Sequence, residues 1–212
     1  MAIIHDNGIQ IRKTVTGSYV NNCYIIVCPT TNESVIIDAP AEPDKILAEA
    51  DDTDVKAVLF THTHFDHIGS YADLKSALGV PMIVHPDDAA QLPEHPDEYF
   101  KHGGTFSFGT ITLDTIHVPG HTPGGVSLLW GKHLFSGDTL FPNGPGNTTS
   151  AENFLTLVKS LGERIFVLDD DTNVYPGHGV ETVIGREKEQ YEVFNKSSHS
   201  PNLYGDVQWL HS

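Results

Sequence analysis

The segment that most constrains this chain is a cluster of metal-ligand residue types directly after an apolar stretch. Residues 55–60 predict a buried strand, and the chain runs from it into His62, His64, Asp66 and His67. His62 and His64 are two residues apart, so they project to the same side of extended backbone. Imidazole and carboxylate are ligands that Zn²⁺ and Fe²⁺ accept. Chance produces this pattern in only about 4 of 1000 chains of this composition, so a metal site is predicted here.

Three further residues share one sequence context with that cluster. His121, Asp138 and His178 each follow a predicted strand and lie beside glycine, which permits tight turns and close approach. The residues of 62–67 are too crowded to surround one ion, so we expect two ions, each completed from these positions. The remaining histidines lack such a context, although His117 is a candidate supporting residue near His121; they are His5, His85, His95, His102, His117, His133, His199 and His211.

The charge balance argues against several classes of partner. Twelve basic and twenty-eight acidic residues give a net charge of −16. Proteins that bind nucleic acid or anionic membranes concentrate Lys and Arg at the contact, so we expect neither partner and a small-molecule substrate instead. The length suits one domain over residues 1–212, with a core large enough to need no disulfides.

The sequence also predicts a compartment. Residues 1–8 lack the features of a signal peptide, and no run approaches the roughly 18 apolar residues of a membrane span. Cys23 and Cys28 are five residues apart, which places them on opposite faces of a strand, so we expect two buried thiols and no disulfide. Together these features predict a cytoplasmic protein.

Hydrophobic periodicity and turn residues divide the chain into two strand-rich segments, each followed by helices. Strands are predicted over residues 9–16, 20–28, 34–37, 55–60, 81–84, 104–108, 111–118, 125–130, 133–135 and around 174. Helices are predicted over 43–50, 68–78, 87–92, 150–161, 163–168 and 181–194, with loops over 93–104 and 142–149. Asp66 and His67 are expected beside the start of the second helix, on its first residues, and Gly79 at its end. This order favours a sheet-on-sheet core covered by helices.

Taken in order, the motifs resemble the metallo-β-lactamase-fold hydrolases, and among them the glyoxalase II-like (hydroxyacylglutathione hydrolase-like) branch. The resemblance covers residues 22 to 188. It is carried by HxHxDH at 62–67, PGHTPGG at 119–125, GDTLF at 137–141 and PGHG at 176–179, with 22–24 and 36–39 resembling the opening strands. It implies an α/β (α+β) fold, a four-layer αββα sandwich of two mixed sheets flanked by helices.

The resemblance also implies ligand roles for seven residues. His62, His64 and His121 would bind a first metal, whereas Asp66, His67 and His178 would bind a second. Asp138 would bridge two divalent ions, with zinc favoured and iron or manganese as alternatives. An Asp rather than a Cys at 138 argues against the β-lactamases that use a Cys ligand.

Such a site suits hydrolysis of a thioester. Two neighbouring ions hold a bridging hydroxide at neutral pH, and Asp66 is expected to orient it as a catalytic residue. A thiolate leaving group with a pKa of about 8.5–9 needs little acid assistance. The resemblance implies S-lactoylglutathione or a related acyl-thiol as substrate.

The sequence lacks the features by which the long glyoxalase II form contacts glutathione. The long glyoxalase II form has a helical C-terminal domain and a Lys and a Tyr after the bridging Asp, whereas only 34 residues follow His178 and residues 142–148 contain neither. Arg186 and Lys188 are the nearest basic candidates for substrate binding.

Three alternatives remain open. One is a mononuclear iron persulfide dioxygenase using His62 or His64 with His121 and Asp138, although its usual Arg-Asp loop is absent. The others are a lactonase or other ester hydrolase, and a metal-bound scaffold without catalysis. Trp209 near the tail is expected to be a surface aromatic, with a docking role in a homodimer as the alternative.

Overall fold

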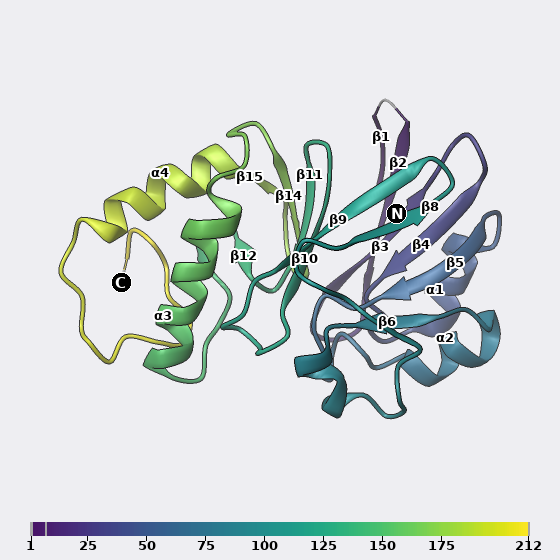
Figure 1. Ribbon diagram of the computed structural model, residues 1–212, viewed down its shortest axis with the longest axis horizontal. Helices are drawn as coiled ribbons and strands as arrows, with labels where there is room; N and C mark the ends of the chain where they lie inside the picture. Colours follow the sequence, from purple (N-terminus) through teal and green to yellow (C-terminus); the bar gives the residue numbers. More distant parts are fainter. Residues whose placement is uncertain (1, 7, 212) are drawn as a thin grey trace.

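Two β-sheets pack face to face in the computed structural model, which describes residues 2–6 and 8–211 (Figure 1). The first sheet has the order β1-β2-β3-β4-β5-β6-β7 and the second β15-β14-β11-β10-β9-β8. Each sheet mixes parallel and antiparallel pairs: β4 to β7 pair in parallel in the first, as do β11 and β14 in the second. The mixed sheets confirm the predicted fold class.

The strands of the first sheet are β1 (Ala2–Asp6), β2 (Ile9–Thr16), β3 (Asn21–Val27), β4 (Glu33–Ile37), β5 (Asp54–Leu59), β6 (Met82–Val84) and β7 (Glu98–Tyr99). Those of the second are β8 (Thr105–Phe108), β9 (Ile111–His117), β10 (Val126–Trp130), β11 (His133–Gly137), β14 (Asn173–Pro176) and β15 (Thr182–Val183). A separate two-stranded ribbon pairs β12 (Leu140–Phe141) with β13 (Gly144–Pro145).

Helices cover the outer face of each sheet. Helices α1 (Pro43–Ala50) and α2 (Tyr71–Leu78) lie against the first sheet, whereas α3 (Ala151–Ser160) and α4 (Ile184–Asn195) lie against the second (Figure 1). A 3₁₀ turn spans Pro86–Gln91, and a π-helical turn at Leu161–Ile165 follows α3 directly. With the helices, the two sheets make four layers.

Three apolar cores follow from this layering: one between the sheets and one beneath each helical layer. Strand β3 is buried along its whole length because both of its faces are covered. Cys23 packs in the core under α1 and α2, whereas Cys28 packs between the sheets, and both thiols are free. The opposite placement of the two cysteines confirms the prediction.

The segment after β5 differs from the prediction in one respect that matters for the site. Helix α2 begins at Tyr71, so Asp66 and His67 lie in a turn before it, not on its first residues. This turn is fixed to the end of β4, because the Ala39 N–H donates to the His67 carbonyl and the Ser70 N–H donates to the Ala39 carbonyl. The helix ends at Gly79 as predicted, in the left-handed region with φ of 63°.

Other differences are smaller. Strands β7 and β13, two residues each, lie in segments predicted as loops. The helix predicted over 163–168 is the π-helical turn, which begins two residues earlier and ends three residues earlier. Trp209 is not a surface aromatic, because it is buried against Tyr191 and Phe194. Within the described residues no helix has both the length and the apolar character needed to cross a membrane.

Candidate metal centre

Four chain segments bring the seven candidate ligands together at one end of the two sheets. Residues 62–67 follow β5, and His121 lies in the connection between β9 and β10. Asp138 comes directly after β11, and His178 follows β14. Strands β11 and β14 are parallel neighbours, so Asp138 and His178 leave the second sheet at the same edge.

The first group consists of His62, His64 and His121. One nitrogen of each ring lies within 4.8 Å of the others, and the ring centroids are 4.5–4.9 Å apart. His62 is buried, whereas His64 is exposed. Three imidazoles from two loops therefore converge on one point.

The second group consists of Asp66, His67 and His178, whose ligand atoms also lie within 4.8 Å of one another. His178 Nε2 is 3.3 Å from Asp66 Oδ2 and 3.2 Å from His67 Nε2. These are the three residues to which the resemblance assigns the second metal.

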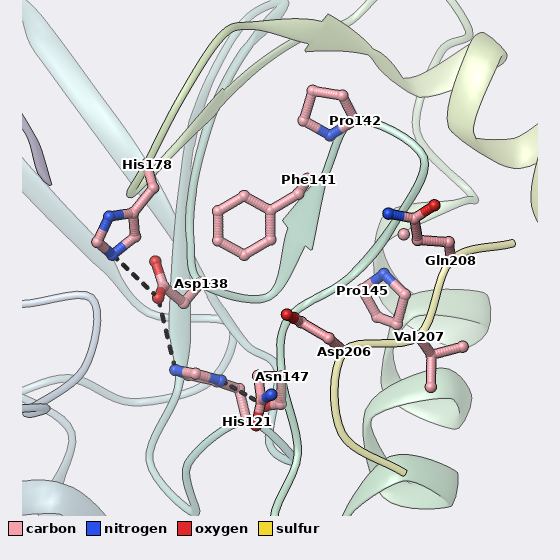
Figure 2. Close-up of a pocket in the computed structure, with 11 residues that line it drawn as sticks. His121, Asp138, Phe141, Pro142, Pro145, Asn147, His178, Asp206, Val207 and Gln208 are labelled. Carbon is pink, nitrogen blue, oxygen red and sulfur yellow. Dashed lines mark hydrogen bonds and ion pairs between the residues drawn. The ribbon is translucent and has the colours of Figure 1, made fainter. Parts of the chain in front are cut away.

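Asp138 reaches both groups. Its Oδ1 lies 3.4 Å from His67 Nε2 in the second group, and its Oδ2 lies 3.7 Å from His121 Nε2 in the first and 3.5 Å from His178 Nε2 (Figure 2). A carboxylate in this position has one oxygen available for each of two ions.

Hydrogen bonds on the far side of each ring aim the Nε2 atoms at the centre. The Nδ1–H groups of His67, His121 and His178 donate to Asp38 Oδ2, the Asn147 carbonyl and the Tyr19 carbonyl, at 2.9, 2.7 and 2.9 Å. In each ring the tautomer set by the acceptor leaves Nε2 as a ligand atom.

The tautomer of His62 is set in the same way, by a hydroxyl group that accepts from its Nδ1–H. Thr61 Oγ1 donates its proton to Asp38 Oδ2, so it accepts from His62 Nδ1 at 3.1 Å. His62 Nε2 is thereby left with its lone pair directed inward.

The centre fits divalent metal ions. His62 Nε2, His121 Nε2 and Asp138 Oδ1 are fully buried and have no hydrogen-bond partner among the described residues. Buried polar atoms without partners are costly unless a ligand satisfies them, and imidazole nitrogen with carboxylate oxygen is the donor set of zinc and iron sites.

The electrostatics agree with ligation. Burial, together with the neighbouring His67, lowers the pKa of His62 well below its usual value, so its ring is neutral at neutral pH. Burial opposes ionisation of Asp138, yet His67 and His178 outweigh it and hold the pKa of the Asp138 carboxyl well below its usual range. The His62 ring and the Asp138 carboxylate are therefore both in the protonation state that a metal requires.

Glycine at two positions allows the backbone to approach Asp138. A Cβ on Gly177, in the motif before His178, would lie 2.2 Å from Asp138 Oδ1, and a Cβ on Gly146 would lie 1.7 Å from the Asp138 carbonyl oxygen. Of the glycines beside the predicted ligands, Gly177 thus packs against the Asp138 carboxylate, whereas Gly120 packs against Leu157 and Gly137 against Thr61.

Two supporting residues were not among the predicted site residues. Asp38 accepts from the backbone N–H and hydroxyl of Thr61 and from His67, and it adopts φ of 62° to do so. Asn21 donates from Nδ2 to Asp66 Oδ2 at 2.9 Å. Asp38 lies within the 36–39 motif that contributes to the resemblance, but only the fold brings it beneath His67.

A cavity of about 330 Å³ opens beside the metal centre (Figure 2). Its wall combines ligands, the loop after Asp138 and the chain's tail: His121, Asp138, Phe141, Pro142, Gly144, Pro145, Asn147, His178, Asp206, Val207 and Gln208. The structure does not bring Arg186 or Lys188 into this wall. Arg186 donates to Asn143 Oδ1 behind the loop, and Lys188 donates to Asp170 Oδ1.

One further His/Asp cluster lies outside the centre. Ligand atoms of His85, Asp87 and His117 fall within 4.8 Å, but the two rings stack 4.0 Å apart at 11°. Ring nitrogens ligate in the plane of the ring, so two nearly parallel stacked rings cannot direct their lone pairs at one ion. His117 Nε2 instead donates to the Pro123 carbonyl at 2.8 Å, in the loop that carries His121.

Comparison with known proteins gives one family. The profile described as the Metallo-beta-lactamase superfamily matches residues 16–191. A hydroxyacylglutathione hydrolase from Polaromonas sp. is 36% identical over 175 residues, covering 79% of this chain and 66% of that protein. Hydroxyacylglutathione hydrolase GloC from Haemophilus influenzae is 29% identical over 204 residues, covering 85% and 96%. These relatives support the glyoxalase II-like branch.

Solved structures agree on the fold. A B3 metallo-beta-lactamase, BLEG-1, and ETHE1 from Myxococcus xanthus each superpose with a TM-score of 0.76, at 27% and 28% identity. Both cover 84% of this chain, and the matched parts are 96% and 81% of those chains. TTHA1623 in a di-iron-bound form has a TM-score of 0.72 at 31% identity, covering 84% of this chain and 96% of that one.

Proposed function

Because this chain belongs to the metallo-β-lactamase superfamily, we propose that it is a metal-dependent hydrolase that cleaves a thioester, such as S-lactoylglutathione or a related acyl-thiol. The observation that carries the proposal is the convergence of His62 Nε2, His121 Nε2 and Asp138 Oδ1 at one side of an open cavity. These three atoms are buried and have no hydrogen-bond partner among the described residues. The two relatives named hydroxyacylglutathione hydrolase support the thioester.

The residues would hold two divalent ions, with His62, His64 and His121 on one, Asp66, His67 and His178 on the other and Asp138 between them. Zinc is our first choice, and the di-iron neighbour makes iron the main alternative. Such ions supply an activated water and stabilise the negative charge that develops on the attacked carbonyl oxygen.

The chain's own groups contribute positioning. Asn21 binds Asp66 Oδ2, and Asp66 Oδ1 has no partner among the described residues, so that oxygen is available to orient the attacking water. Asp38 keeps the His67 ring fixed through its Nδ1–H. The cavity wall formed by residues 141–147 and 206–208 would hold the substrate against the centre.

The test begins with metal content, measured by plasma mass spectrometry on protein grown with zinc and iron both present. The loaded protein is then assayed with S-lactoylglutathione, a panel of other thioesters, lactones and a β-lactam, the last because of the similarity to BLEG-1. Two ions per chain and thioester turnover that is lost on chelation support the proposal. Turnover restricted to lactones or the β-lactam contradicts the thioester.

A mononuclear iron persulfide dioxygenase is the second candidate, supported by the similarity to ETHE1 at 28% identity. It predicts one iron per chain and oxygen uptake with a persulfide. Either result in place of thioester hydrolysis would overturn the first proposal.

A further inference from the structure

The tail of the chain forms one wall of the cavity. Residues 205–209 alternate in burial: Val207 and Trp209 are buried in the core with α3 and α4, whereas Asp206 and Gln208 are exposed and line the cavity. Figure 2 shows the Asp206 carboxylate directed inward from the tail, toward the side where Phe141, Asp138 and His121 lie. The Val207 N–H donates to the Gly205 carbonyl at 3.1 Å, so the chain turns at Asp206.

Backbone contacts fix the tail in this position. The Trp209 N–H donates to the Asn143 carbonyl at 2.8 Å, and Gly205 and Thr148 exchange two hydrogen bonds of 3.3 Å. The Val207 carbonyl oxygen packs so closely on Gly144 that a Cβ there would lie 2.4 Å from it. Asp206 is thus held on the cavity wall by its neighbours on both sides.

The charge on this wall is negative. Asp206 has no hydrogen-bond or ion-pair partner among the described residues, and the lining of the cavity includes no Lys or Arg. Its only basic side chains are His121 and His178, which belong to the metal centre. Phe141 adds an aromatic ring to the same cavity.

Three basic residues outside this lining are engaged elsewhere. Arg186 donates to Asn143 Oδ1 at 3.0 Å behind the loop, and Lys188 pairs with Asp170 at 3.2 Å. Lys13, beside the His178 loop, donates to the Gly179 carbonyl and pairs with Glu181 at 2.8 Å. The lining of the cavity therefore offers a substrate carboxylate no Lys or Arg to balance the charge of Asp206.

We propose that the part of the substrate bound in this cavity carries a cationic ammonium group, placed between the Asp206 carboxylate and the Phe141 ring. A carboxylate attracts a cation, and an aromatic face adds a cation–π contribution. This inference rests on the proposed hydrolase function, and it makes Asp206 a determinant of substrate choice. A thiol with two free carboxylates, as in glutathione, would be disfavoured.

The test compares three thioesters that share one acyl group: those of thiocholine (cationic), 3,3-dimethylbutanethiol (its neutral isostere) and 3-mercaptopropionate (anionic). Each is assayed with the metal-loaded wild type and with Asp206→Asn. Comparing the two proteins on the same substrate cancels the intrinsic reactivity of each thioester. We expect Asp206→Asn to lower kcat/KM for the thiocholine ester by roughly fivefold and to raise it for the anionic ester.

Two variants make the comparison specific. Asp114→Asn removes the same charge at an exposed position of β9, away from the cavity. It should leave the ratio of variant to wild-type kcat/KM unchanged for all three esters. Asp206→Lys should favour the anionic ester over the cationic one. Equal effects of Asp206→Asn on all three esters would overturn the inference while leaving thioester hydrolysis intact.

A binding measurement separates failure of the inference from failure of the proposed function. Choline, which cannot be hydrolysed, is titrated into wild type and Asp206→Asn and followed by NMR chemical-shift changes. Asp206-dependent binding supports the cationic subsite even if no thioester is turned over. Absence of binding to the wild type contradicts it.

Discussion

The two halves of the metal centre are built from different chemistry. The first group is three imidazoles, and the side chain of its exposed member, His64, has ring contacts with His62 and His121. The second group contains a carboxylate, Asp66, and is backed by Asn21 and Asp38 through hydrogen bonds. Asp138 is close to both.

The difference lies in charge and in support. Neutral imidazoles bring no negative charge to a dication, so an ion in the first group depends on Asp138 for the negative charge that balances it. The second group contains the Asp66 carboxylate, and the Asp38 carboxylate lies behind His67. Asp138 and Asp38 together outweigh burial and raise the pKa of the His67 ring. We expect the second group to hold its ion more tightly, and ion binding there to release the His67 proton.

Removing Asp138 should abolish this asymmetry by weakening both sites. For Asp138→Ala we expect kcat/KM to fall by about 10²- to 10³-fold, because the residue holds charge at the centre of the reaction. Metal content should fall below one ion per chain. The circular dichroism spectrum should be unchanged, since Asp138 follows the end of β11 and is not part of a core.

A collapsed spectrum for Asp138→Ala would indicate a structural metal site. The matched control is Asp171→Ala, an exposed carboxylate paired with Lys132, which should leave metal content and activity unchanged.

Deleting one ligand from each group tests which ion is held more weakly. His64→Ala should lose the first ion and keep the second, whereas His178→Ala should retain more of its ion because Asp66 and His67 remain. We expect the apparent metal affinities of the affected sites to fall by about 10- to 100-fold in each case, with His64→Ala at the upper end. Stepwise competition with a chelator measures both, and equal losses would remove the asymmetry.

Asp38→Asn acts directly on His67 in the second group and, through Thr61, on His62 in the first. Asn tolerates the left-handed backbone that position 38 adopts, and its carbonyl still accepts from His67, but its amide cannot accept from the Thr61 N–H. We expect about tenfold weaker metal binding in the second group and a smaller loss in the first, which Asp38 reaches only through the Thr61 hydroxyl. Asp38→Ala should weaken metal binding in the second group further. An effect confined to the first group would contradict the role assigned to the hydrogen bond between His67 and Asp38.

Much of the centre was predictable because its ligands are local. Four of the seven lie within six consecutive residues, and the other three sit beside glycines at strand ends. The division into two triplets required only the resemblance to the family. The boundaries of α1 were also predictable, since Pro43 fixes the first turn of that helix.

The remaining parts depend on long-range contacts. Asp38 and His67 are 29 residues apart, and nothing local to Asp38 announces its acceptor role. Trp209 was expected to be a surface aromatic. It is buried instead, because α3 and α4 leave an apolar surface that it covers. Asp206 reaches the cavity only as a consequence of that burial.

The smallest expected effect concerns Asn21, whose amide donates to Asp66 Oδ2 and contacts His178 Nε2 at 3.3 Å. In Asn21→Ala the carboxylate loses one neutral donor, a change worth about 1 kcal/mol or roughly fivefold in kcat/KM. Metal content should stay at the wild-type value, because Asn21 adds no charge and its amide donates rather than ligates. Asn21→Asp should instead repel Asp66 and lower activity further. If Asn21→Ala removed an ion, the second group would depend on neutral support as well as on charge, and the contrast between the two halves would rest on hydrogen bonding more than on carboxylates.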